Sequence, residues 1–313
     1  MSGSEIPECP QCGRKPTFGA TYCPYCGTRL SSARQPVTVA PIPERRSLSG
    51  PCAVLVRDRL HVPIAQVGRI IAKALGQPLG DVTREIRVNR GFLARQMPAA
   101  EAVALAEKLE AIGLGVLVLP EASVGSLPEA DRMKSASFSE AGLDCIAYRW
   151  DSTEEIHAPW ASILLASCAR VEKREVRQVA SRDEDGDRGE KGGLLKITPP
   201  HKIPKLETNV RLEFVIDIFL QEPRRRLRMD ENTCAYALVD IGSFTGGGAE
   251  YYRAARNLLR YGRGVALNPG VRLLAENAPQ EAWAELTFET KHEFDMYNLW
   301  LLQLLRFGLP VPE

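Results

Sequence analysis

Four cysteines near the beginning of the chain have the types and spacing needed to bind a metal ion. They form two Cys-x-x-Cys pairs separated by ten residues. Thiolate sulfur is a soft ligand that selects zinc or an iron centre. Because protein would fill all four positions around a tetrahedral ion, no position remains for water or substrate, as in a structural site. The candidate ligands are Cys9, Cys12, Cys23 and Cys26.

Each pair has the form Cys-Pro-x-Cys-Gly, in which proline fixes φ for a tight turn and glycine allows φ above zero. This form and spacing resemble the short CPxCG zinc ribbons over about residues 7–30. The resemblance implies one structural Zn²⁺ held by the four cysteines. Rubredoxins share the CPxCG knuckle but separate the pairs more widely, so zinc is favoured over iron. A dithiol redox site is the third interpretation.

The composition limits the number of domains, the kinds of partner and the cellular location that we expect. The chain has 313 residues, 44% apolar and 25% charged, with a formal net charge of +1. We therefore expect two or three domains and no polyanionic partner from global charge alone. Four further cysteines are isolated, and reduced thiols beside a thiolate metal site predict a cytoplasmic location. The first residues lack an apolar signal region and the tail over 299–309 is short and interrupted, so we expect no transmembrane segment.

The pattern along the chain predicts a multidomain α+β protein. A zinc ribbon (1–30) is followed by a proline- and serine-rich linker (31–50), a small α/β domain (51–120) and a second polar linker (121–137). An antiparallel sheet domain with a closing helix is expected over 138–313. These linkers predict domains that are tethered to one another rather than fused.

Short apolar strands and amphipathic helices follow one another in the small α/β domain. Strands are predicted at 53–56 and 116–119. Three helices are predicted between them, the first opened by Pro63 and the third by Pro98. The expected order is therefore strand–helix–helix–helix–strand.

This order resembles the C-terminal domain of the bacterial ribosomal stalk protein and the fold of the ClpS adaptor. The resemblance implies a module that docks protein partners, with Gly68, Arg69 and Lys73 as candidate contacts. The first strand ends in Arg57-Asp58, where ClpS carries an Asn-Asp pair. The ClpS pocket for N-terminal residues is therefore not implied.

A local charge bias leaves a second function open. Residues 51–98 contain eight basic and three acidic side chains, and a basic face of this size suits RNA or an acidic protein. Ribbon and basic helix together would suit an RNA- or ribosome-associated factor. Phe92 is the one aromatic residue in this stretch, so base stacking is poorly supported and protein partners are the prediction.

From about residue 138 the apolar pattern changes to a period of two, which predicts strands. The strongest strand spans 210–220, and the chain is expected to turn at Glu222-Pro223 and return through Leu227. Helices are predicted at 249–261 and 293–307. Strands followed by a long closing helix indicate an α+β domain.

The segment from Ile156 to Ile163, with Pro159-Trp160 in its middle, resembles the "strand, Pro-Trp, Ile" start of bacterial pleckstrin-homology-like domains. The resemblance implies an interaction module. A run of arginines near the expected hairpin is typical of a solvated turn, and in such a domain it would meet acidic lipid headgroups. These arginines are Arg224, Arg225, Arg226 and Arg228.

A glycine-rich turn at 240–248 carries the one specific enzymatic alternative, because it resembles motif I of S-adenosylmethionine methyltransferases. Only 65 residues follow Gly248, too few for the βα units of such a domain. The four histidines are scattered, so no catalytic residues are predicted. The sequence thus predicts a zinc-binding, non-enzymatic adaptor or regulatory protein that docks protein partners, with the RNA-associated factor and the methyltransferase as alternatives.

Overall fold

The computed structural model describes residue 14 and residues 39–58, 62–149, 152–179, 205–221, 224–230 and 249–312. The four predicted metal ligands and the glycine-rich turn at 240–248 lie outside the described residues. The described part is a mixed α+β structure with two sheets, one of three strands and one of eight. No helix in it combines the length and apolar character needed to cross a bilayer.

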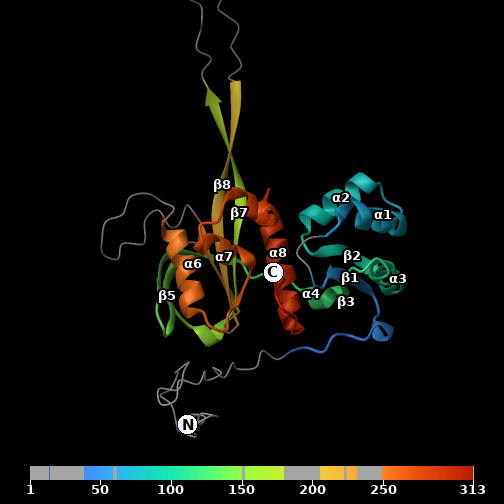
Figure 1. Ribbon diagram of the computed structural model, residues 1–313, viewed down its shortest axis with the longest axis horizontal. Coiled ribbons are helices and arrows are strands. Elements are labelled where there is room, and N and C mark those ends of the chain that lie inside the picture. Colours follow the sequence, from blue (N-terminus) through green and yellow to red (C-terminus); the bar gives the residue numbers. More distant parts are fainter. Residues whose placement is uncertain are drawn as a thin grey trace, which may run out of the picture.

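The small unit, residues 51–120, is built around one fully buried strand (Figure 1). Its central strand pairs antiparallel with a strand on each side, and proline precedes each of its helices. The elements are β1 (Pro51–Val56), α1 (Ile64–Leu75), α2 (Leu79–Val88), β2 (Phe92–Pro98), α3 (Ala99–Glu110) and β3 (Val116–Pro120).

The strand β2 was missing from the predicted order, which is therefore wrong at this point. A bulge breaks its pattern, since its register with β1 shifts between Ala94 and Met97. Gln96 lies at the bulge with φ of 55°, in the left-handed region. The carboxylate of Glu121 holds this turn by accepting hydrogen bonds from the Gln96 N–H, at 3.1 Å, and from Arg95 Nε, at 2.8 Å.

The expected polar linker over 121–137 is also wrong, because most of it is helix and strand. It holds α4 (Glu121–Val124) and the start of β4 (Ala130–Phe138). The end of the other expected linker packs on the body of the protein as well. Within it lies a 3₁₀ turn (Arg45–Ser47), and Ala40 donates its N–H to the Arg306 carbonyl at 2.9 Å.

The large sheet is mixed rather than antiparallel as predicted, because β4 pairs parallel with β9. Its strand order is β10-β7-β8-β9-β4-β5-β6, and β11 also pairs with β7. The remaining strands are β5 (Gly142–Arg149), β6 (Ser152–Pro159), β7 (Ile163–Val179), β8 (Lys205–Leu220), β9 (Arg225–Asp230), β10 (Ala266–Leu267) and β11 (Thr287–Phe288).

This sheet must curl, because one tight corner joins strands that are far apart in its order. Only Trp160–Ser162 lie between the end of β6 and the start of β7. Three residues span roughly 10 Å even when extended, so these two strands approach each other there. Trp160 fixes the corner by donating its indole N–H to the Ser139 carbonyl at 2.9 Å.

Ahead of the closing helix, one helix and a 3₁₀ segment pack beside β7, and a further helix packs on that helix. Asn268, before the helix beside β7, replaces a strand partner: its side chain accepts from the Cys168 N–H at 2.8 Å and donates to the Cys168 carbonyl at 2.9 Å. These elements are α6 (Ala249–Tyr261), α7 (Pro269–Ala275) and the 3₁₀ segment (Gln280–Leu286).

The closing helix α8 (Lys291–Arg306) lies between the large sheet and the small unit, so the two are packed together rather than tethered (Figure 1). Trp300 donates its indole N–H to the Val56 carbonyl at 2.7 Å, and Gln303 donates to the Val124 carbonyl at 2.9 Å. A Cβ on Gly91 would lie 2.2 Å from the Trp300 ring. The turn before β2 is therefore pressed against this helix.

Gly91→Ala tests this packing, with Gly113→Ala as its matched control. Both glycines have positive φ, 82° and 78°, but an added methyl group meets open space only at Gly113. We expect Gly113→Ala to lower the free energy of unfolding by about 1 kcal/mol through backbone strain. Gly91→Ala should lower it by about 3 kcal/mol, since a clash with Trp300 is added. Urea denaturation measures both, and equal losses would contradict the packing of α8 on the small unit.

Candidate functional site

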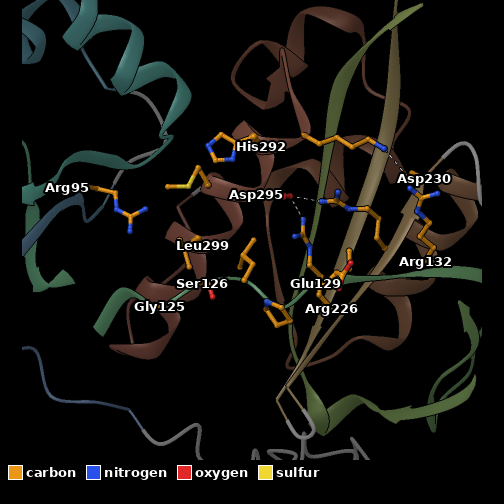
Figure 2. A pocket seen from close by; sticks show the side chains of 16 residues that line it. Arg95, Gly125, Ser126, Glu129, Arg132, Arg226, Asp230, His292, Asp295 and Leu299 are labelled. Atoms are coloured by element: carbon orange, nitrogen blue, oxygen red, sulfur yellow. Dashed lines mark hydrogen bonds and ion pairs between the residues drawn. The ribbon is translucent and has the colours of Figure 1, made fainter. Parts of the chain in front are cut away.

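A cavity of about 630 Å³ opens where the small unit, β4, β9 and α8 meet (Figure 2). One wall is the connector between α4 and β4, residues 125–130. Arg95 faces it from the small unit, and Met296 and Leu299 line it from α8. Its size lies in the range of small-molecule sites, but its lining is more charged than most.

Two arginines of β9, Arg226 and Arg228, form the deep side of this cavity. Two residues apart on a strand, they point to the same face, and both reach the carboxylate of Asp217 on β8. Arg228 donates from Nε to Oδ1 at 2.7 Å and from Nη2 to Oδ2 at 2.8 Å. Arg226 donates from Nε and Nη2 to Oδ2 at 3.0 and 2.6 Å. One buried carboxylate thus orients two guanidinium groups.

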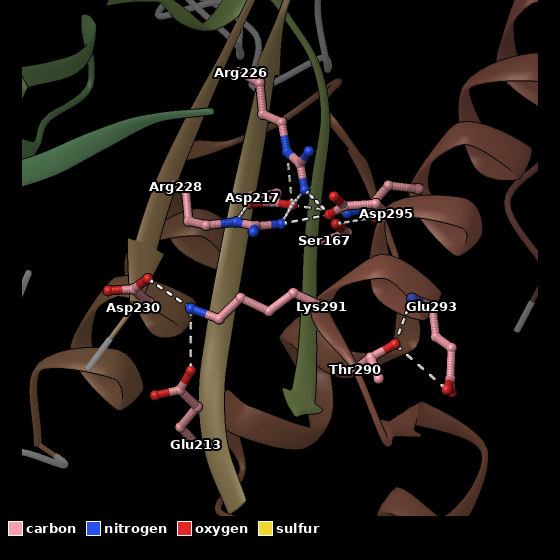
Figure 3. A network of polar contacts seen from close by, with 11 residues as sticks. Ser167, Glu213, Asp217, Arg226, Arg228, Asp230, Thr290, Lys291, Glu293 and Asp295 are labelled. Atoms are coloured by element: carbon pink, nitrogen blue, oxygen red, sulfur yellow. Dashed lines mark hydrogen bonds and ion pairs between the residues drawn. The ribbon is translucent and has the colours of Figure 1, made fainter. Parts of the chain in front are cut away.

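The helix α8 completes this ion network (Figure 3). Asp295 accepts from Nη2 of Arg226 and, at 2.8 Å, from Nη2 of Arg228. Asn298 donates to Oδ2 of Asp217 at 2.8 Å and accepts from the Ser167 hydroxyl at 2.5 Å. The network therefore ties β7, β8, β9 and α8 together through side chains that hydrogen-bond one another.

Charge pairing decides the protonation of this network. Burial alone would raise the pKa of Asp217, but the charges and hydrogen bonds of Arg228 and Arg226 outweigh it and hold the pKa below its ordinary value. Burial alone would lower the pKa of Arg228, and Asp217 and Asp295 outweigh it in the same way. Asp217 and Arg228 are therefore both charged at neutral pH.

Lys291, at the first turn of α8, joins a second cluster at the edge of the cavity. Its ammonium lies 3.0 Å from Asp230 Oδ2 and 3.2 Å from Glu213 Oε1 (Figure 3). Thr290 caps the start of the helix by accepting from the Glu293 N–H at 3.2 Å, and the Glu293 carboxylate accepts from the Glu289 N–H at 3.3 Å. This cap fixes where Lys291 stands.

The arginine run is therefore not the solvated turn that the sequence suggested. Arg225 points to the opposite face from Arg226 and donates twice to Asp131, at 3.0 and 2.8 Å, and once to Glu154, at 2.9 Å. Arg224 is the exposed member and donates to the Ser126 carbonyl at 3.1 Å. Three of the four guanidinium groups are thus held by carboxylates of the same chain.

The other residues predicted to contact a partner, on the small unit, do not form one surface in the structure. Gly68 is buried against α2, where an added Cβ would lie 3.3 Å from Leu79, while Arg69 and Lys73 are exposed. Arg90 is not part of the expected basic face, because it donates to the Thr287 carbonyl at 3.3 Å and is buried, which lowers its pKa. Arg95 is paired with Glu121. The basic face that remains on the small unit is correspondingly smaller.

The described residues contain no arrangement typical of nucleophilic catalysis. Burial raises the pKa of Cys145 to about 12 and also raises the pKa of Cys168, so both thiols are poor nucleophiles. His157 contacts Asp144 at 2.6 Å, and both side chains are exposed. In the same part of the chain no group of three His, Cys, Asp or Glu side chains could hold a metal ion.

Comparisons with known proteins identify no relative of this chain. No family model matches it, and neither the curated proteins nor the solved structures contain a match.

Sequence reasoning found the arginines of the network but missed their partners. Asp131, Asp217 and Asp295 are separated by about 80 residues each, and the basic run is adjacent to none of them. The one available signal was Asp217 itself, a carboxylate in the middle of the most apolar strand of the chain. A buried charge in such a strand requires a partner of opposite sign.

Asp217→Asn tests the network, with Asp144→Asn as a matched exposed control. Losing the buried carboxylate leaves two buried guanidinium groups with one remaining counter-charge, so we expect the free energy of unfolding to fall by about 4 kcal/mol. Asp144→Asn should change it by less than about 1 kcal/mol. Chemical denaturation at neutral pH measures both, and a small effect of Asp217→Asn would contradict the assigned pairing.

The lowered pKa of Asp217 also predicts how stability depends on pH. A carboxylate with a folded pKa below its unfolded value of about 3.9 contributes its full stabilisation above that value. The contribution is lost as pH falls through the folded pKa. Wild type should therefore lose stability below about pH 4 more steeply than Asp217→Asn. Parallel slopes in denaturation series from pH 6 downward would contradict this sign.

Proposed function

We propose that this chain is a zinc-binding, non-enzymatic adaptor of the cytoplasm that docks protein partners. The observation that carries the proposal is a two-stranded arm that extends from the large sheet (Figure 1). At the base of the arm, the last residue of β8 that pairs with β9 is Val215, and the last residue of β7 that pairs with β11 is Val171. Beyond these points β7 and β8 pair only with each other among the described residues.

The arm spans Glu172–Val179 of β7 and Lys205–Phe214 of β8 and extends roughly 27 Å at about 3.4 Å per residue. Its pairing continues without a register shift to Val179 and Lys205. An isolated two-stranded ribbon is marginally stable in water, because it has no apolar face to bury. An arm of this length is therefore typical of a surface that a partner covers.

One face of the arm is apolar as well as charged. Val210 and Leu212 are 49% and 41% exposed, and they continue the row of Phe214, whose ring packs 5.2 Å from Trp283. Opposite them in the register stand Arg174 and Glu172, which form an ion pair with each other. The face thus offers two apolar side chains beside one cation and one anion.

This chemistry suits a protein partner better than RNA. Over 172–179 and 205–214 the arm contains five basic and four acidic residues, a difference of one charge. Nucleic-acid binding depends on a clear excess of cations along the contact surface. We therefore assign the arm to a protein segment that brings apolar side chains to Val210 and Leu212 and one charge of each sign to their neighbours.

The zinc part of the proposal rests on the cysteine spacing alone. We propose that Cys9, Cys12, Cys23 and Cys26 hold one structural Zn²⁺ in a ribbon, and that the small unit is a stalk-protein-like or ClpS-like docking module. The ribbon then adds a second docking surface to the small unit, the large sheet and α8, which pack together. Two surfaces on one chain raise the effective concentration of one partner near another.

Elemental analysis of the full chain tests the metal. We expect about one zinc per chain, because four thiolates complete a tetrahedral site. The double variant Cys12→Ser, Cys26→Ser should lose it, and Cys234→Ser, which changes an isolated cysteine, should retain it. Wild-type protein that contains iron, or no stoichiometric metal, would contradict the assignment.

A cross-linking pull-down tests the arm with two variants of equal chemical change. Val210→Asp with Leu212→Asp places charge on the arm face, and Ile146→Asp with Tyr148→Asp does so on β5, where both side chains are 37% exposed. We expect the first variant to lose the proteins that wild type retains and the second to keep them. Thermal unfolding confirms that both variants fold. Retention of the same proteins by the arm variant would rule out this surface.

A further inference from the structure

The cavity between the small unit and the large sheet is separate from the arm that we assign to protein docking, and two arginines form its deep side. Each guanidinium group on its deep side uses Nε and Nη2 for the aspartates, and no described residue accepts a hydrogen bond from Nη1 of either group. The side chains of Arg226 and Arg228 are 4% and 9% exposed. Two buried cations thus keep donors available beside the cavity they line (Figure 2).

These donors are fixed before any ligand arrives. Asp217 and Asp295 hold both guanidinium planes through multiple short hydrogen bonds, so binding an anion there requires little ordering of side chains. A planar guanidinium presents N–H groups at the angles that carboxylate and phosphate oxygens accept. The aspartates that orient the arginines also neutralise their net charge, so further positive charge must come from elsewhere on the wall.

Arg132 supplies that charge at the rim, where His292 also lies. Both side chains are exposed and line the cavity, and neither forms a salt bridge within the described residues. Two of the acidic residues on the wall are already engaged, Asp295 by Arg226 and Arg228, and Asp230 by Lys291. The remaining one, Glu129, is exposed.

Part of the lining is apolar, which limits the ligand further. Met296 and Leu299 of α8 and Leu127 of the connector face the cavity. A bare inorganic anion would leave this wall and most of the volume of about 630 Å³ unused. The lining therefore suits a small molecule with an oxyanion at one end and an apolar or aromatic body at the other.

We propose that this cavity binds a small phosphorylated molecule, with its phosphate at Arg226, Arg228 and Arg132 and its body against Met296 and Leu299. A phosphate directs oxygens toward three separate cations, whereas a carboxylate directs two oxygens in one plane.

Calorimetry with the full chain and three probes tests this site: phenyl phosphate, inorganic phosphate and benzoate. We expect phenyl phosphate to bind more tightly than either of the others, because it alone combines the phosphate and the apolar body. Arg132→Gln, which removes an exposed cation and leaves the buried network intact, should weaken phenyl phosphate about tenfold. Arg84→Gln, on the exposed face of α2, should bind it as wild type does.

Three results would overturn the proposal. The first is no binding of phenyl phosphate by wild type at millimolar concentration. The second is benzoate binding as tightly as phenyl phosphate, which would assign a carboxylate ligand instead. The third is an equal effect of Arg132→Gln and Arg84→Gln, which would show attraction by general surface charge. None of these results bears on the arm or the ribbon, whose tests are separate.

Discussion

The burial of α8 on both sides is the constraint on which the rest of the structure depends. A helix that packs on one sheet shows an apolar stripe and a polar face, whereas α8 buries residues around most of its circumference. On the side that faces the sheet, Asn298 joins the ion network. On the other side, Trp300 donates to the Val56 carbonyl and packs against the turn at Gly91. Two layers that would otherwise be separate domains share one core through this helix.

The buried ion network has a second role beside holding strands and helix together. Replacing such a network with apolar side chains is often neutral or stabilising in other proteins, so stability alone is weak grounds for keeping it. Here the pairs fix a register: Arg226 and Arg228 meet both Asp217 of β8 and Asp295 of α8 only if β8, β9 and α8 lie in one relative position. The same pairing that specifies the position of α8 also keeps two guanidinium groups oriented at the cavity.

Much of the fold was predictable from local patterns. The period-two pattern gave β8 and β9, and the helical spacing gave α1, α3, α6 and α8, because each pattern reflects burial on a nearby face. β2 was missed because the bulge at Gln96 breaks its alternation. β4 was missed because Ala130–Phe138 is rich in small and polar residues, and its place beside β9 depends on a parallel pairing of distant segments.

The candidate site was not predictable to the same degree, for a physical reason. Its arginines are adjacent in sequence, but their carboxylates come from β4, β8 and α8 and meet them only after the sheet has formed. The cavity exists only between the two units, which the polar appearance of 121–137 had suggested were independent. Packing of distant segments, rather than any motif, creates this site.

The unbroken register of the arm has a consequence for its length. From Leu165 to Val179, each residue of β7 faces one residue of β8 without a bulge. Removing a single residue from one strand would turn every side chain beyond it to the opposite face. Removing two from each strand would preserve the faces and shorten the ribbon by about 7 Å. The length of the arm can therefore change in even steps while Val210 and Leu212 keep their direction.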